Sequence, residues 1–418
     1  MSARALYLAD QVRRGSKRLA KAVYRRPLIS AARIYRALCF DRVSLIGITG
    51  SSGKTTTKDL VELILSSRFQ AHKSSDTNNS LFSVAETLLR MPRGARICIQ
   101  ELGAFQNEDL GALVALYRPQ IGVVTNVAHE HFRAERAAEE KIKLIRALPE
   151  NGVAVLNADD ERVRAMATDA RCRVITFGHS ANADLRGCCI RSRWPDRLAL
   201  TLLYENESVE CTTQLCGEHL FGCVLAAVAV GLAFGMTLRE AVAPIPSFVP
   251  VVGRMMPYET TSGITFIRDD WKAPLWSVKA PLDFLRNARA KRKIAVIGTL
   301  SDYSRKSSKV YVDVGDAALQ SAEHVVFVGP SAHKALRVKQ IPEGKTLRAF
   351  ATPREVAEHL RAFLEPGDLV LLKSSGGDHL ARYALMYNRE VRCWRERCGR
   401  DLMCDNCSLL SVPAKRGQ

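Results

Sequence analysis

The stretch GITGSSGKTTT, residues 47–57, joins a predicted strand over residues 43–49 to a helix predicted from Lys54 to about Ser66. Glycines at such a junction let backbone N–H groups turn toward phosphate oxygens, and the helix N-terminus adds its positive end. The spacing is a short variant of the general phosphate-loop pattern, because Ile48 stands where that pattern has a glycine. The alternative is a Gly/Ser turn beside a chance lysine. The candidate phosphate-binding residues are Gly50, Ser51, Ser52, Gly53, Lys54, Thr55 and Thr56.

Strands and helices alternate on both sides of this loop. Apolar strands are predicted at 95–102, 121–127 and 152–158, with a helix from about Asp109 to Tyr117. Short alternating runs over 183–214 predict antiparallel strands, and a second strand and helix series follows a proline-rich boundary at 243–253. The sequence therefore predicts an α/β protein: a central phosphate-loop ATPase domain with a mostly parallel sheet, and a C-terminal Rossmann-like α/β domain. The predicted parts are a basic helical arm (1–42), the central domain (43–245), the C-terminal domain (254–386) and a Cys-rich tail (387–418).

Composition limits the class of protein. The chain has 418 residues, 47% of them apolar, and a net charge of +18, so it can bury large cores and favours polyanionic partners such as nucleotides. Half of that charge lies in residues 1–42, which hold 11 Lys and Arg against two Asp. We expect this arm to form one or two basic helices. Two interpretations stay open: a solvated basic face or poorly ordered arm, or a peripheral contact with an anionic membrane from the cytoplasmic side.

One apolar run bears on location. Residues 220–238 are 19 positions without a charged side chain, so the run approaches the length of a membrane span. Its Ala and Gly content suits a helix buried inside the protein equally well, and we favour that interpretation. With no secretory signal predicted, we expect a cytoplasmic protein with reduced thiols.

Several motifs occur in the order typical of one family. They are TGSSGKTTTKDL, Asn78-Asn79 with SLFSVAETLL, Glu101-Leu102-Gly103, RPQIGVVTNVAHEHF, EEKIKLIRALPENGVAVLNADD, Gly253-Arg254 and FIRDDWKAP. Together they resemble the Mur ligase family, within it the branch that adds D-alanyl-D-alanine to a UDP-muramoyl tripeptide. The resemblance covers residues 43–379 and implies an ATP- and Mg²⁺-dependent ligase that forms an amide bond through an acyl phosphate.

The resemblance also implies site residues in the central domain. Thr55, Glu101 and His131 would hold Mg²⁺, with Lys54 neutralising phosphate charge. His131 lies five residues after Asn126, as in the family pattern, whereas His129 is a local alternative. Lys141 would be the lysine that CO₂ converts into a carbamate, although Lys143 competes for that position and the interval from His131 is about four residues shorter than usual in the family.

In the C-terminal domain, Arg254, Asp270 and Lys272 resemble residues that close over ATP, and Lys373-Ser374 resembles a substrate-contacting turn. Two departures accompany these matches. The family's adenine motif reads Gly217-Glu218-His219-Leu220-Phe221-Gly222-Cys223, without its asparagines. The family's UDP-binding domain has no room before residue 43, so we expect a carboxylate other than the UDP-muramoyl tripeptide, joined to an amino acid, peptide or amine.

The tail carries four closely spaced cysteines: Cys393, Cys398, Cys404 and Cys407. Four thiolates can satisfy tetrahedral Zn²⁺, so a structural zinc site is one interpretation and free thiols the other.

Two alternatives to the ligase stay open on the residues alone. A nucleic-acid-binding NTPase would suit the charge of +18, but the aromatic residues do not interleave with the basic arm, so nucleic acid is an unlikely partner. A non-catalytic nucleotide-binding homologue would be expected to lack the metal ligands, which are all present.

Overall fold

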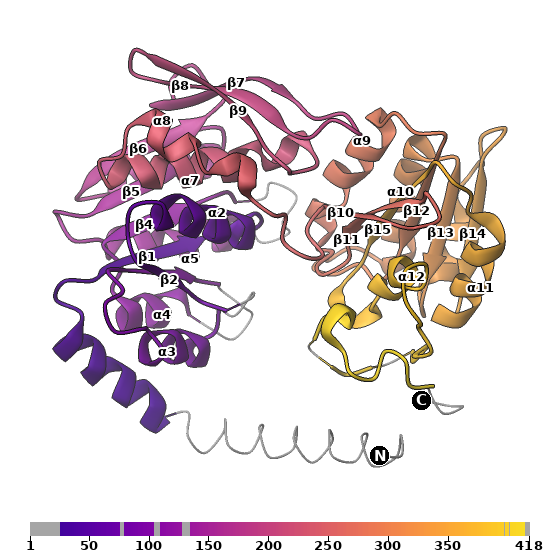
Figure 1. Cartoon of the computed structure of the whole chain (residues 1–418), viewed down its shortest axis with the longest axis horizontal. Coiled ribbons are helices and arrows are strands. Elements are labelled where there is room, and N and C mark those ends of the chain that lie inside the picture. Colours follow the sequence, from indigo (N-terminus) through magenta and orange to yellow (C-terminus); the bar gives the residue numbers. More distant parts are fainter. Residues whose placement is uncertain are drawn as a thin grey trace.

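The computed structural model describes residues 26–75, 79–103, 109–127, 134–396, 398–400 and 402–413. Its described residues form two α/β lobes that lie side by side, and the phosphate loop belongs to the N-terminal one, called the first lobe below (Figure 1).

The first lobe is built on a nine-stranded sheet in the order β2-β3-β1-β4-β5-β6-β7-β8-β9. Strands β2 to β7 pair in parallel, and β8 and β9 continue the sheet antiparallel, as the alternating pattern over 183–214 predicts. The register sets Ile48 opposite Glu101, so the phosphate loop and Glu101 leave neighbouring strands at one edge. The strands are β1 (Ser44–Thr49), β2 (Ala71–Lys73), β3 (Ile97–Glu101), β4 (Ile121–Val124), β5 (Val153–Asn157), β6 (Arg173–Gly178), β7 (Leu185–Arg191), β8 (Ala199–Tyr204) and β9 (Glu207–Thr212).

Helices cover both faces of this sheet because successive strand residues point to opposite sides. Ile46 and Ile48 belong to one buried cluster, with α2 and α7, whereas Leu45 belongs to the other, with α3, α4 and α5. A helix over residues 26–39 packs on the second cluster. The labelled helices of this lobe are α2 (Lys54–Ser66), α3 (Leu81–Leu89), α4 (Leu110–Tyr117), α5 (Ala134–Arg146), α6 (Glu161–Ala165), α7 (Phe221–Ala233) and α8 (Leu238–Val242).

The apolar run 220–238 is an internal helix. It forms α7 and the turn after it, and α7 packs against α2 and against β5, β6 and β7. Every residue from Val224 to Val230 is fully buried. Among the described residues, no helix is both long enough and apolar enough to cross a membrane. The interpretation of this run as a buried helix is confirmed.

The second lobe is built on a six-stranded sheet in the order β10-β11-β15-β12-β13-β14, parallel except for β10. The strand and helix series predicted after the boundary at 243–253 is confirmed, and its apolar runs form β11, β12, β13 and β15. The elements are β10 (Met256–Glu259), β11 (Thr265–Asp269), α9 (Lys279–Asn287), β12 (Arg292–Ile297), α10 (Ser307–Ser321), β13 (His324–Val328), β14 (Thr346–Phe350), α11 (Pro353–Phe363), β15 (Asp368–Lys373) and α12 (Ala381–Leu385).

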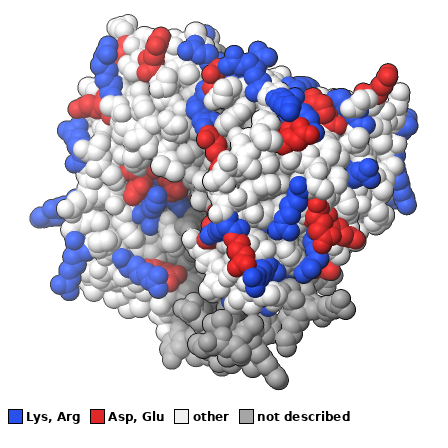
Figure 2. All heavy atoms as spheres, turned by 45° about the vertical axis from the view of Figure 1, so that its right-hand side comes forward, with Lys and Arg blue, Asp and Glu red and all other residues white. Residues whose placement is uncertain are grey.

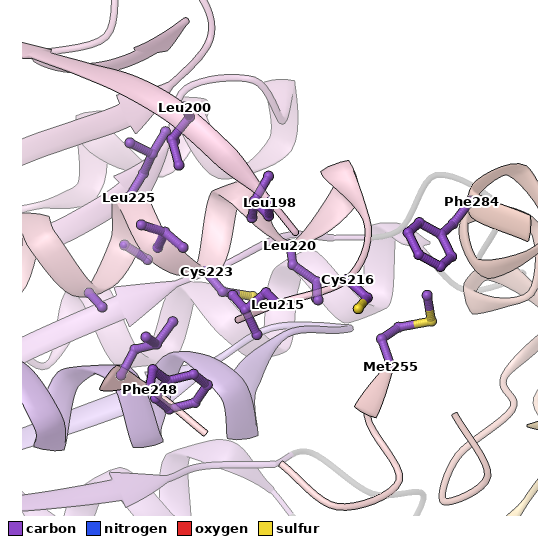
Figure 3. Close-up of a cluster of buried hydrophobic side chains, with 14 of the residues drawn as sticks. Leu198, Leu200, Leu215, Cys216, Leu220, Cys223, Leu225, Phe248, Met255 and Phe284 are labelled. Carbon is purple, nitrogen blue, oxygen red and sulfur yellow. The ribbon is translucent and has the colours of Figure 1, made fainter. Parts of the chain in front are cut away.

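A continuous apolar cluster joins the two lobes. Figure 3 shows Cys216 and Leu220 of the first lobe pointing toward Met255 and Phe284 of the second. All four side chains are less than one-tenth exposed. The burial of this apolar surface stabilises the arrangement in which both lobes face one cavity.

Candidate active site

A cavity of about 920 Å³ lies between the lobes. Its volume suits a nucleotide together with part of a second substrate. One wall is the phosphate loop with Glu101 and Lys141, and the facing wall carries Arg254, Lys272 and Lys373. On the molecular face drawn in Figure 2, cationic and acidic side chains are interspersed.

The phosphate loop is held open by contacts with the end of β4. Asn126 Oδ1 accepts hydrogen bonds from the backbone N–H groups of Ser51 and Ser52, at 3.1 and 3.0 Å, and Thr125 Oγ1 donates to the Ser52 carbonyl at 2.7 Å. A Cβ at Gly50 would lie 1.8 Å from Thr125 Oγ1, so only glycine fits there.

The helix after the loop begins without a side-chain cap among the described residues. Gly53 occupies the N-cap of α2 with a φ of 80° and provides no side-chain cap, and the first turn carries no acidic residue. The N-terminus of this 13-residue helix therefore faces the cavity with no side-chain cap from the described part of the chain, which favours an anionic ligand.

Thr55 and Glu101 meet as the resemblance implies. Thr55 Oγ1 donates a 2.8 Å hydrogen bond to Glu101 Oε2, and both side chains are buried, with 6% and 3% exposed. Asn79 Nδ2 donates to the other carboxylate oxygen at 3.3 Å. A buried hydroxyl and a carboxylate beside a phosphate loop are oxygen ligands of the kind that Mg²⁺ prefers, so these residues fit that ion.

Lys54 lies within a cluster of charges. Its Nζ donates to the Gly50 carbonyl at 2.7 Å. Burial lowers the pKa of Lys54, Glu101 raises it, and the nearby cations Arg254 and Lys272 lower it further. Three cations brought together in one cavity create a strongly positive field, which a polyphosphate would neutralise.

The structure separates the two competing lysines. Lys141 lines the cavity with 6% of its surface exposed, and its Nζ donates a 3.3 Å hydrogen bond to the Ala137 carbonyl. Burial and, to a smaller extent, Lys54 lower the pKa of Lys141 to about 8, against the opposing effects of Asp160 and Glu140. Lys143 points outward and forms ion pairs with Asp109 and Glu140. Of these two lysines, Lys141 lines the cavity and Lys143 does not. His131 and its alternative His129 lie outside the described residues.

Of the C-terminal residues, Arg254 and Lys272 line the cavity but Asp270 does not. Asp270 is buried beside Arg268, at 3.5 Å, and burial raises its pKa. The cavity is lined instead by its neighbour Asp269, whose Oδ2 accepts a 2.6 Å hydrogen bond from Lys373 Nζ. Successive residues at the end of a strand point to opposite sides, and this alternation separates the two carboxylates.

The motif that departs from the family pattern forms a third wall. Phe221 and Cys223 line the cavity, and the Cys223 thiol lies 3.6 Å from the Gly53 carbonyl. Across this wall the rings of Phe221 and His179 lie 6.2 Å apart, between centroids. The family's adenine motif has two asparagines that are absent from this wall. The aromatic rings instead provide a surface on which a nucleotide base can stack.

The described residues of the tail do not support the zinc site that was one interpretation of its four cysteines. Within the described ranges, no group of three or more His, Cys, Asp or Glu side chains is arranged to hold a metal ion. Cys393 and Cys404 are buried thiols, and burial raises the pKa of Cys404 to about 12. The tail is held by Arg382, which donates to the Cys393 and Arg395 carbonyls, and by a two-pronged ion pair between Arg268 and Asp405.

Sequence reasoning did not identify several residues of the cavity. Thr125 and Asn126 position the phosphate loop, and Asn79 contacts Glu101. Asn79 and Asn126 both lie in motifs quoted above. A polar residue next to the end of a predicted strand could therefore have marked them as site residues. Arg136 and Asp269 also line the cavity, but no local pattern distinguishes them.

Comparison with known proteins agrees with this geometry. Residues 48–231 match the Mur ligase middle domain, and residues 253–376 match the Mur ligase glutamate ligase domain. The UDP-N-acetylmuramoyl-tripeptide–D-alanyl-D-alanine ligase of Mycobacterium tuberculosis is 29% identical over 368 residues, covering 82% of this chain and 72% of its own; that of Bacillus subtilis is 24% identical, covering 80% and 73%.

Solved structures show the same fold. The corresponding ligase of Acinetobacter baumannii superposes with a TM-score of 0.76 at 25% identity, covering 86% of this chain and 78% of its own. A Thermotoga maritima ligase in complex with ADP gives a TM-score of 0.75 at 21% identity, covering 86% and 82%. With both domain models matched in order around one cavity, the chain belongs to the Mur ligase family, whose members are ATP-dependent ligases that form amide bonds.

Proposed function

We propose that this chain joins a small-molecule carboxylate to an amino acid, peptide or amine at the expense of ATP, with Mg²⁺ bound in the cavity between the lobes. The observation that carries the proposal is the buried Thr55–Glu101 pair beside a phosphate loop, facing Arg254 and Lys272 across one cavity. The cations of this cavity can hold two anionic substrates next to each other, because they neutralise the negative charges that would otherwise repel.

The reaction has two steps. A carboxylate oxygen attacks the γ-phosphorus of ATP, ADP leaves, and an acyl phosphate forms. The amine nitrogen then attacks the acyl carbon, inorganic phosphate leaves with the bonding electrons, and the nitrogen gives up a proton. Lys54, Arg254 and Lys272 lie where they can stabilise the negative charge on the transferred phosphoryl group.

Thr55 and Glu101 would hold Mg²⁺, together with His131, and the ion would supply charge neutralisation for the phosphates. Lys141 would carry a carbamate and so add one more carboxylate to this group. Its burial in the cavity and its pKa of about 8 support this role, because CO₂ reacts with the neutral amine.

Phosphate release from ATP and Mg²⁺ tests the proposal, measured with the purified chain against pairs of carboxylates and amines. The panel includes the UDP-N-acetylmuramoyl tripeptide and D-alanyl-D-alanine, which the names of the relatives give. It also pairs other small carboxylic acids with amino acids as the amine. Turnover that requires both an acid and an amine, and that Lys141→Ala lowers but Lys143→Ala does not, supports the ligase. Turnover stimulated by a polynucleotide instead, or nucleotide binding without turnover for any pair, contradicts it.

A further inference from the structure

The helix over residues 26–39 has two different faces. Leu28, Ile29, Ala32 and Tyr35 pack on the core of the first lobe. The opposite face holds Pro27, Ala31, Ile34 and Leu38, all of them exposed, at the spacing that lines one side of a helix. Ile34 is 61% exposed and Leu38 is 75% exposed. This outer apolar stripe contributes nothing to the core of the described structure.

Positive charge borders the stripe. Arg26 and Arg33 lie along its flank, and Arg42 follows the helix; all three are exposed, and none has an acidic partner among the described residues. Residues 1–25, which precede this part of the chain, add seven Lys and Arg against one Asp. Apolar side chains with flanking arginines are the arrangement found in helices that lie in the interface of an anionic membrane.

A neighbouring cleft points to the same kind of ligand. It has a volume of about 490 Å³ and lies between this helix, the end of α4 and the end of α5. Arg36 and Arg118 both line this cleft, and burial, together with the charge of Arg118, lowers the pKa of Arg36. The buried Nε of Arg36 has no hydrogen-bond partner among the described residues. A phosphate group in this cleft would relieve the repulsion between the two guanidinium groups.

We propose that the outer face of the helix over residues 26–39 docks this enzyme on an anionic lipid membrane. Ile34 and Leu38 enter the interface, and Arg26 and Arg33 contact lipid phosphates. A second copy of the chain fits less well, because pairing two such stripes would bring the flanking arginines of both copies together. A polynucleotide would leave the apolar stripe in contact with water.

Sedimentation of the full chain with lipid vesicles tests the proposal. One set of vesicles contains 30% phosphatidylglycerol in phosphatidylcholine, and the other contains phosphatidylcholine alone. We expect binding to the anionic set that weakens with salt. Ile34→Ser with Leu38→Ser lowers the partition coefficient by about 10-fold or more, and Arg26→Gln with Arg33→Gln lowers it by about 30-fold.

Matched control variants carry the same types of substitution at exposed positions outside this helix. Leu336→Ser with Ile341→Ser removes two other exposed apolar side chains, which are 51% and 44% exposed, and Arg239→Gln with Arg354→Gln removes two exposed arginines. These variants should bind vesicles as the original chain does, and all variants should bind ATP equally. The proposal is overturned if the chain does not bind anionic vesicles, if the control variants lose binding equally, or if Ile34→Ser with Leu38→Ser instead dissociates a dimer in solution.

Discussion

Replacing Lys141 tests the chemistry of the cavity most directly. In the proposed function, the neutral Lys141 amine attacks CO₂, a C–N bond forms, and one proton is released to leave a carbamate. Lys141→Ala removes this carboxylate, and Lys141→Arg keeps a cation that cannot form it. Lys143→Ala is the matched control, because Lys143 lies two residues away but is ion-paired at the surface.

The structure sets the size of the effect. An amine with the usual pKa of 10.5 is only about 0.03% neutral at pH 7, whereas one with a pKa of about 8 is about 9% neutral. Burial in the cavity therefore increases the reactive form about 300-fold. Because the pKa is lowered, the neutral fraction falls about 10-fold for each pH unit below 8, so the carbamate is lost on acidification. We expect loss of the carboxylate to reduce ATP turnover by about 100-fold or more.

Two assays check this reasoning. Carbon-13 NMR of the chain equilibrated with ¹³C-labelled bicarbonate should show a carbamate signal that Lys141→Ala abolishes and Lys143→Ala retains. ATP turnover should fall when CO₂ is removed from the buffer, and a short carboxylate such as formate should partly restore Lys141→Ala. A fully active chain without a carbamate signal and without dependence on CO₂ would refute the role given to Lys141.

Three further predictions concern the loop, the metal ligands and the tail. Glu101→Gln removes one negative charge beside the phosphate loop, so the Mg²⁺ concentration that half-saturates nucleotide binding should rise at least about 10-fold in calorimetric titrations; unchanged Mg²⁺ dependence would contradict its role as a ligand. Gly50→Ala places a Cβ against Thr125 Oγ1, so nucleotide affinity should fall about 10-fold or more while the far-UV circular dichroism stays the same. Asp405→Asn removes the closer of the two carboxylates that pair with the buried Arg268, leaving Asp270 at 3.5 Å, and should reduce the free energy of unfolding by about 2–4 kcal/mol in urea titrations. Burial alone would raise the pKa of Asp405, but Arg268 outweighs it and the pKa is lowered, so its stabilisation is present at neutral pH and is lost as the pH falls below about 4; an equal difference between the two proteins at pH 3 and pH 7 would contradict this.

Local sequence was sufficient to predict the elements around the site. The helix predicted from Lys54 to Ser66 has those limits in the structure, and the strands before it and at 121–127 are where the apolar runs lie. These features depend on neighbours within a few residues: glycines that permit the loop, apolar runs that favour buried strands, and a Gly-Lys junction at a helix start.

Only the tertiary structure decided between residues that are equivalent in sequence. Lys141 and Lys143 are both helix lysines, but one is buried near Lys54 and Asp160 and the other pairs with Asp109 across the surface. Asp269 and Asp270 are adjacent, but only Asp269 faces the cavity. The four closely spaced cysteines of the tail left zinc and free thiols both open, and in the structure the tail is held by Arg382 and Arg268. The partners in each case lie far away in sequence, and burial, charge and hydrogen bonding at a side chain depend on those distant neighbours.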